Sequence, residues 1–192
     1  MNMHEPKALL FDCFGLFAPD PLVTFFLQRF GPDSLPLKDH FCEPGDLGDI
    51  TIDQLYENME RELGVKKEEV EKHLDEVVHP DEKMIAFVQQ LKTRHPCYLL
   101  SNCMPGMLER FFGKTTFFDC FTKQYRSYEI KHIKPYPDYF EYVLSDLGLK
   151  PEETLSIDDN PVNVAAAAKL GIEAIQFTGF EPFVQEMNRR GL

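Results

Sequence analysis

The sequence predicts an α/β fold, a parallel sheet covered by helices, that is interrupted by a small all-helical insertion. A short apolar strand is expected at residues 7–12, and helical and strand patterns alternate in the second half of the chain. Such alternation is typical of parallel sheets with right-handed crossovers. The stretch between these two parts has helical patterns only. We therefore expect a core made of residues 1–18 and 84–192, and a helical domain made of residues 19–83.

Each expected element follows from local signals. In the insertion, apolar residues recur at helical spacing between a capping Thr51 and a stop at Gly64. In the core, short apolar runs bounded by turn residues indicate strands. The expected strands are 7–12, 97–102, 117–125, 154–158 and 172–177. The other expected helices are 66–80, 81–95, 105–113, 135–149 and 160–171.

Composition limits the partners. The chain has 192 residues, 43% of them hydrophobic and 27% charged, as in a globular protein that buries a core. A net charge of −12 disfavours nucleic acids and anionic membranes, and no apolar run is long enough to span a bilayer. The five cysteines lack a C-x-x-C spacing, so we expect reduced thiols in a cytoplasmic protein.

Polar side chains follow the expected strands where each strand ends. In a parallel sheet these ends meet at one edge, where ligands bind. Taken singly, Asp12 is equally typical of a turn or a helix cap, Ser101 and Asn102 are more typical of a cap, and Lys134 is more typical of a solvated side chain. Together they offer carboxylates that need a cation, oxygen ligands that suit Mg²⁺, and groups that suit a phosphoryl oxygen. These residues are Asp12, Ser101, Asn102, Lys134, Asp158 and Asp159.

The order of these groups resembles the haloacid dehalogenase (HAD) superfamily, whose phosphatases use an aspartate nucleophile. The matching stretches are "LLFDCFGLF", "YLLSN", "IKPYPDYFEYVL" and "TLSIDDNPVNVAAAAKLGIEAIQF", and together they extend from residue 8 to about residue 177. Residues 43–59 resemble the helical cap that follows the first motif in the phosphatase-like branch. The resemblance implies a Rossmann-like three-layer core with a parallel sheet, a helical cap, and a small phosphorylated metabolite as the substrate.

The resemblance also implies a role for each residue at the strand ends. Asp12 would attack phosphorus and form an aspartyl-phosphate. Mg²⁺ would be held by Asp12, by the backbone carbonyl of Phe14 and by Asp159, with Asp158 acting through a water. Lys134 would offset negative charge in the transition state. Ser101 and the backbone of Asn102 would bind the phosphoryl oxygens. Asn163 fits a place behind the metal waters, or faces the site by chance.

One position departs from the family pattern. HAD phosphatases usually carry a second Asp two residues after the nucleophile as general acid and base, and here that residue is Phe14. Loss of a general acid typically costs about 10²–10⁴-fold in rate. The sequence therefore favours substrates with good leaving groups, or a replacement acid from the cap loop. His40, Glu43 and Asp46 are the candidates, although each is more typical of an ordinary exposed loop residue.

The departure leaves other functions open. A 2-haloacid dehalogenase tolerates an aromatic residue at position 14, but needs no metal and lacks the acidic pair of Asp158 and Asp159. A catalytically impaired binding or regulatory protein would keep the fold and the metal. A mutase needs the missing acid and base. The sequence favours a magnesium-dependent phosphatase, acting as a monomer or a homodimer, and does not identify its substrate.

Overall fold

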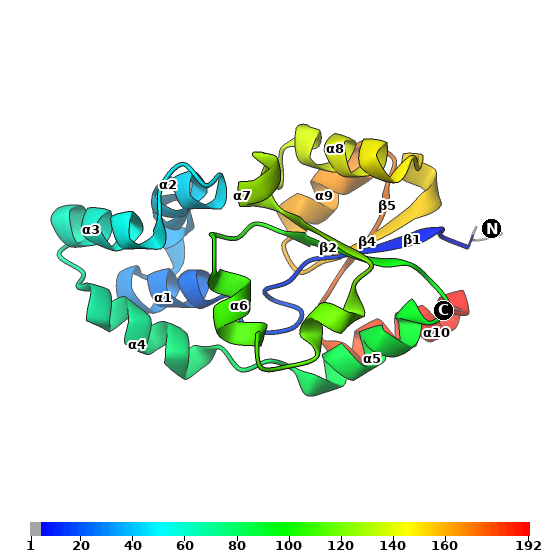
Figure 1. Cartoon of the computed structure of the whole chain (residues 1–192), viewed down its shortest axis with the longest axis horizontal. Coiled ribbons are helices and arrows are strands. Elements are labelled where there is room, and N and C mark those ends of the chain that lie inside the picture. The colour runs from blue at the N-terminus through cyan, green and yellow to red at the C-terminus, as the bar shows by residue number, and fades with distance from the viewer. Residues whose placement is uncertain (1–4) are drawn as a thin grey trace.

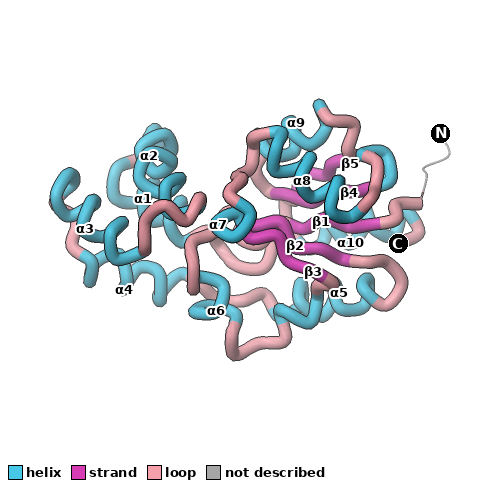
Figure 2. Tube along the Cα trace, turned by 45° about the horizontal axis from the view of Figure 1, so that its top comes forward, coloured by secondary structure: helices cyan, strands magenta, loops and turns pink. Residues whose placement is uncertain are grey.

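The computed structural model describes residues 5–192 and has a five-stranded parallel sheet at its centre (Figures 1 and 2). The strand order is β3-β2-β1-β4-β5, and every neighbouring pair is parallel. The strands are β1 (Ala8–Phe11), β2 (Cys97–Ser101), β3 (Lys123–Arg126), β4 (Thr154–Asp158) and β5 (Glu173–Gln176). The expected α/β class with a parallel sheet is confirmed.

Helices cover both faces of the sheet and make the core a three-layer, Rossmann-like structure (Figure 1). One face packs against α5 (Glu82–Lys92), α6 (Met107–Phe112) and α10 (Phe180–Arg190). The other face packs against α8 (Pro137–Leu147) and α9 (Pro161–Lys169). Because both faces are covered, the central strand β1 is fully buried along its length, which explains its unbroken apolar sequence.

Four helices between β1 and α5 form a separate group beside one end of the sheet (Figures 1 and 2). They are α1 (Pro21–Phe30), α2 (Leu35–Asp46), α3 (Ile52–Leu63) and α4 (Lys67–Val77). Phe26, Leu55 and Met59 lie in an apolar cluster of their own, which also takes in Met104 and Met107 from the chain after β2. We call α1–α4 the helical segment.

Local sequence signals set the bounds of α3 as expected. The Thr51 side chain accepts a hydrogen bond from the Gln54 backbone, and the Gln54 side chain accepts one from the Thr51 backbone. This reciprocal pair satisfies donors that a helix start leaves free. Gly64 ends the helix with φ at 68°, in the left-handed region that glycine enters without strain.

Two parts of the core differ from the sequence-based expectation. The expected strand over 117–125 begins instead with a 3₁₀ helix, Phe117–Cys120, and only its end belongs to β3. Phe117 stacks on Phe112 with ring centroids 4.0 Å apart, so inward packing of aromatic rings overrides the strand pattern. Helix α10 was not expected, although Phe183 and Met187 are four residues apart and are both buried.

Short elements complete the fold. They are the 3₁₀ helices Pro32–Ser34 and Pro151–Glu153 and the single-turn helix α7 (Ser127–Ile130). All five cysteines are buried with free thiols, in line with the expected reduced state. Within residues 5–192, no helix combines the length and apolar character needed to cross a membrane.

Candidate active site

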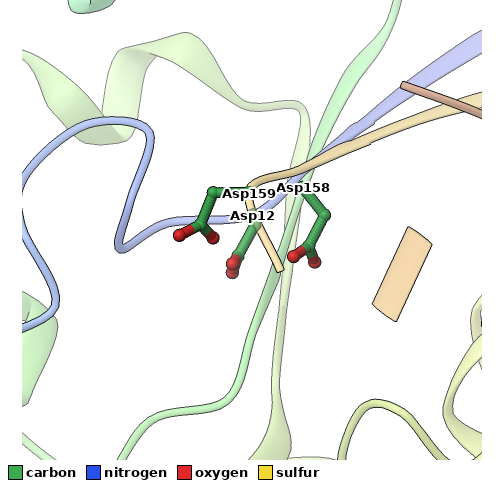
Figure 3. A group of neighbouring side chains, drawn as sticks. All are labelled: Asp12, Asp158 and Asp159. Atoms are coloured by element: carbon green, nitrogen blue, oxygen red, sulfur yellow. The ribbon is translucent and has the colours of Figure 1, made fainter. Parts of the chain in front are cut away.

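The polar residues predicted at the strand ends meet at one edge of the sheet. Asp12 directly follows β1, and Asp158 ends the neighbouring strand β4 and is followed by Asp159. Figure 3 shows these three side chains gathered in one place. One carboxylate oxygen from each lies within 4.8 Å of the others. The topology thus brings together residues that are almost 150 positions apart in the sequence.

Lys134 is the cation of this group. Its Nζ lies 2.8 Å from Asp12 Oδ1 and 2.7 Å from Asp158 Oδ2, and only 2% of its side chain is exposed. Burial alone lowers the pKa of Lys134, but the adjacent charges of Asp12 and Asp158 raise it above its ordinary value. Lys134 is therefore a fixed positive charge beside the Asp12 carboxylate.

The carboxylate of Asp158 is held from several sides. The Asn163 side-chain amide lies 3.1 Å from both of its oxygens, and the backbone N–H of Asn160 donates to Oδ1 at 2.9 Å. With Lys134 on Oδ2, these donors occupy much of the capacity of the carboxylate. Asp158 is thus suited to orienting its neighbours, and Asn163, which the sequence left open, is part of the same network.

The group carries more negative than positive charge. Burial and the charge of Asp158 raise the pKa of Asp12 to about 8, although Lys134 opposes the shift. Burial and the same neighbour raise the pKa of Asp159 to about 6. Oxygen donors with an excess of negative charge fit a hard divalent cation such as Mg²⁺. Burial is the larger cause of these raised pKa values and mutual repulsion the second, and a bound cation would oppose both by favouring the charged carboxylates.

Gly15 makes this arrangement sterically feasible. A Cβ atom at position 15 would lie only 2.2 Å from the carboxyl group of Asp159, and the φ of Gly15 is 85°. A side chain at this position would fill the space beside Asp159. The turn after the nucleophile position therefore approaches Asp159 as closely as the backbone allows.

Ser101 and Asn102, predicted to bind phosphate, differ in their surroundings. Ser101 is fully buried at the end of β2, whereas Asn102 lines the cavity above the carboxylates. The Asn102 side chain donates to the carbonyl of Lys134 at 2.7 Å and accepts from its backbone N–H at 2.9 Å. The side chain of Asn102 thus fixes the loop that carries Lys134, a role that the sequence did not indicate.

The cavity lies between the strand ends and the helical segment. The core contributes Asp12, Lys134 and Asp159 to its lining, and the other side contributes Asp20, Lys38 and Asp46. The three candidates expected on a cap loop lie instead on helix α2. Only Asp46 is among the lining residues; His40 is exposed and Glu43 is partly buried. Asp20 and Lys38 were not predicted. Asp20 caps α1 and reads as an ordinary N-cap in the sequence.

Phe14 borders the same cavity. Its side chain is 9% exposed and packs against the rings of Phe111 and Phe112, with centroids 6.3 and 6.1 Å away. A phenyl ring exchanges no proton. The position where HAD phosphatases usually carry a second Asp is thus apolar and held by aromatic packing.

A family model for haloacid dehalogenase-like hydrolases matches residues 6–171, most of the chain. The chain belongs to the haloacid dehalogenase-like hydrolase family. This result confirms the resemblance seen in the sequence motifs. The match includes Asp12, Lys134 and Asp159, and it extends across the helical segment.

Known HAD proteins resemble the chain in sequence and in fold. A D-ribitol-5-phosphate phosphatase of Bacteroides thetaiotaomicron is 31% identical over 103 residues, which are 50% of this chain and 50% of that protein. The chain thus aligns with about half the length of this curated relative. A crystal structure of a HAD family enzyme from B. thetaiotaomicron superposes with a TM-score of 0.75 at 25% identity, covering 96% of this chain and 99% of the other.

Two further solved structures extend the comparison. The B. thetaiotaomicron enzyme in complex with magnesium and inorganic phosphate has a TM-score of 0.70 at 26% identity and covers 89% of this chain and 93% of that one. A predicted HAD-like family hydrolase from Porphyromonas gingivalis has a TM-score of 0.76 at 23% identity, with 97% and 99% coverage. The second comparison bears on the fold alone.

Proposed function

We propose that this HAD-family hydrolase is a Mg²⁺-dependent phosphatase that acts on a small phosphate monoester through Asp12. The observation that carries the proposal is the contact of 2.8 Å between the Asp12 carboxylate and the buried Lys134, beside two further carboxylates. The relatives agree with it, because one is a D-ribitol-5-phosphate phosphatase and another binds magnesium and inorganic phosphate.

In this proposal, Asp12 attacks phosphorus and forms an aspartyl-phosphate that water then hydrolyses. Lys134 offsets the charge on Asp12 and on the transferred phosphoryl group. The Asn102 backbone, at the cavity, binds phosphoryl oxygens, and we propose that Ser101 assists, although its side chain is fully buried beside Asn102. Asp12 and Asp159 hold Mg²⁺ together with the Phe14 carbonyl, and Asp158 acts through a water. The bound ion supplies positive charge to the phosphoryl oxygens.

The helical segment serves as a cap over the active site. Asp20, Lys38 and Asp46 line the cavity opposite Asp12, so a substrate bound there is enclosed between the cap and the sheet. Enclosure favours a small phosphorylated metabolite over a macromolecule, and the net charge of −12 disfavours nucleic acids. We propose the same division of the chain as in the sequence analysis, with residues 19–83 as the cap domain.

The alternatives fit the site less well. Phe14 is compatible with a dehalogenase, but a dehalogenase does not require the acidic pair of Asp158 and Asp159 beside Asp12. A protein that only binds phosphate would not need Asp12 paired with a buried lysine.

The test is hydrolysis of p-nitrophenyl phosphate and acetyl phosphate with and without Mg²⁺, with Asp12→Asn as the control. Equal rates for both proteins would favour the binding function.

A further inference from the structure

We propose that Asp46, from the last turn of α2, is the general acid and base of this active site, in place of the group that Phe14 cannot supply. The proposal rests on the proposed phosphatase function and adds the residue that exchanges the proton. Four features of the structure support it: the cavity lining, the exclusion of the other candidates, the contacts that hold Asp46 to the core, and its electrostatic surroundings.

Asp46 lies at the junction of two cavities. The first contains Asp12, Lys134 and Asp159, and the second, narrower one is lined partly by Met104 and Met107. The two cavities share the lining residues Phe14, Asp20, Lys38, Asp46 and Asn102. A phosphoryl group on Asp12 occupies the first cavity, so its leaving group extends toward the shared lining. Asp46 is thus placed on the leaving-group side.

Two other residues among the shared lining carry charge, and neither suits proton transfer as well. Asp20 Oδ1 accepts hydrogen bonds from the backbone N–H groups of Leu22 and Val23 at 2.9 Å, which commits it to capping α1. Lys38 lies 2.7 Å from the carboxylate of Asp39, and its pKa is raised above its ordinary value, so it stays charged. Asp46 is therefore the shared carboxyl group best suited to exchanging a proton.

The core holds the backbone of Asp46 directly. Ser127 Oγ donates to the Asp46 carbonyl at 2.6 Å, and Lys131 Nζ donates to the carbonyls of Leu47 and Gly48 at 2.6 and 3.0 Å. These carbonyls lie at the last residue of α2 and on the two residues after it, where a helix leaves acceptors unsatisfied and favours a nearby cation. We call these contacts of Ser127 and Lys131 the latch. The latch fixes the end of α2 over the cavity.

Two glycines allow the end of α2 to lie this close to the core. A Cβ atom at Gly45 would come within 2.6 Å of the Met104 side chain, and one at Gly48 would lie 3.0 Å from Lys131 Nζ and 3.1 Å from Tyr128 Cβ. Gly48 also has a φ of 69°, where other residues are strained. A residue larger than glycine at either position would displace the side chain of Met104 or Lys131, or shift the end of α2.

The charges around Asp46 suit a proton donor near neutral pH. Burial raises its pKa to about 7, the nearby acidic side chains add to the shift, and Lys38 opposes it. General acids and bases act best when their pKa lies near the working pH. The titratable groups that face Asp46 are Asp20 from the start of α1, Lys38, Asp39, Cys42 and Glu43 from α2, and Cys103 from the chain after β2.

Asp46 donates a proton in the first step and accepts one in the second, so protons balance over the two steps. In the first step, an Asp12 oxygen bonds to phosphorus, the bond from phosphorus to the ester oxygen breaks, and the ester oxygen takes the proton of Asp46. In the second step, water bonds to phosphorus and gives a proton to the Asp46 carboxylate. The bond from phosphorus to Asp12 breaks, which regenerates both side chains and releases phosphate.

The test compares wild type, Asp46→Asn and Asp33→Asn on phosphate monoesters with Mg²⁺. Asp33 is an exposed carboxylate of the same helical segment and serves as the matched control. We expect Asp46→Asn to lower kcat/KM for an alkyl phosphate about 10²-fold. For p-nitrophenyl phosphate, whose leaving group needs no proton, kcat/KM should stay within about threefold of the wild-type value. The fall of kcat/KM for the alkyl ester above about pH 7 should disappear in the same variant.

Several outcomes separate this inference from the proposed function. An equal loss of kcat/KM for all esters in Asp46→Asn, or no loss, overturns the role of Asp46 while leaving the phosphatase intact. Wild-type rates no higher than those of Asp12→Asn overturn the phosphatase itself.

Lys131→Met tests the latch by the same leaving-group readout. If Lys131 is a positioning residue for Asp46, the loss of kcat/KM is larger for the alkyl ester than for p-nitrophenyl phosphate. An equal loss for both esters shows that Lys131 only supports the fold.

Discussion

The two sides of the active-site cavity are built differently. On the sheet side, Lys134 and Asp158 are buried, Asp12 is partly buried, and contacts of 2.8 Å or less join Lys134 to both carboxylates. On the helical side, Asp46 belongs to a segment that reaches the core through backbone carbonyls. Ion pairs and hydrogen bonds hold the charged groups of the sheet side in place, as charge stabilisation requires. The helical side depends on how the segment docks, which suits proton transfer and substrate choice.

The largest effect should follow from breaking the sheet side at Lys134. Lys134→Met leaves Asp12 and Asp158 without their shared cation, so we expect kcat to fall by at least about 10²–10³-fold. Removing one partner of a buried ion pair typically also lowers the free energy of unfolding by about 3–5 kcal/mol. Steady-state kinetics and thermal unfolding measure both. Lys114→Met, at an exposed position, is the control, and equal activity of the two variants would refute the role of Lys134.

The next effect concerns the metal. Mg²⁺ at one hundred times its Kd should stabilise the wild-type protein by about 2.7 kcal/mol, because it binds the folded state only. Asp159→Asn removes one negative donor beside Asp12, so most of this gain should vanish. Thermal unfolding with and without Mg²⁺ measures the difference. A full stabilisation by Mg²⁺ in the variant would place the ion elsewhere.

A third experiment tests whether the proton comes from Asp46 on the helical side of the cavity. Phe14→Asp supplies the carboxyl group that the family pattern expects, and the sequence alone predicts faster turnover of poor leaving groups. With Asp46 as the acid, we expect a gain of about tenfold or more on alkyl phosphates only when Asp46→Asn is also present. The same large gain with Asp46 intact would contradict the role of Asp46. Because the ring of Phe14 packs against Phe111 and Phe112, unfolding must be measured alongside kinetics.

The smallest effect should come from a network of ion pairs on α10, whose residues do not line the active-site cavity. Arg189 and Arg190 on α10 lower the pKa of Glu186 to about 2. A carboxyl group with a lowered pKa stabilises the fold above its unfolded pKa and loses that effect as pH falls through the folded value. Glu186→Gln should therefore cost less than about 1 kcal/mol at neutral pH, and the cost should shrink as the pH falls toward the folded pKa of about 2. Chemical denaturation at several pH values checks this, and a larger cost would show that surface pairs rival the buried network.

The sheet side could be predicted from the sequence because its residues are tied to strand ends. Asp12 and Asp158 each close a short apolar run, and parallel topology brings such ends together whatever lies between them. The roles of Asn102 and Ser127 could not be predicted, because their partners are backbone atoms of Lys134 and Asp46 at distant positions.

The helical side was harder to predict for a similar reason. His40, Glu43 and Asp46 are equivalent as sequence, and only the docking of α2 places Asp46 in the cavity lining. Helix α10 was missed because its apolar positions are few, although they lie on one face. Docking between segments, unlike the polar residues at strand ends, leaves little trace in a single sequence.

The most direct test of the account is hydrolysis of p-nitrophenyl phosphate by wild type and by Asp12→Asn, with and without Mg²⁺. We expect activity in the wild type that requires Mg²⁺, and none above background in Asp12→Asn. Acid quenching during turnover should trap phosphate covalently on the wild-type protein and not on the variant, since an acyl phosphate forms only on the Asp12 carboxylate. Equal, metal-independent rates in both proteins would contradict the central claim that Asp12 is the nucleophile of a phosphatase.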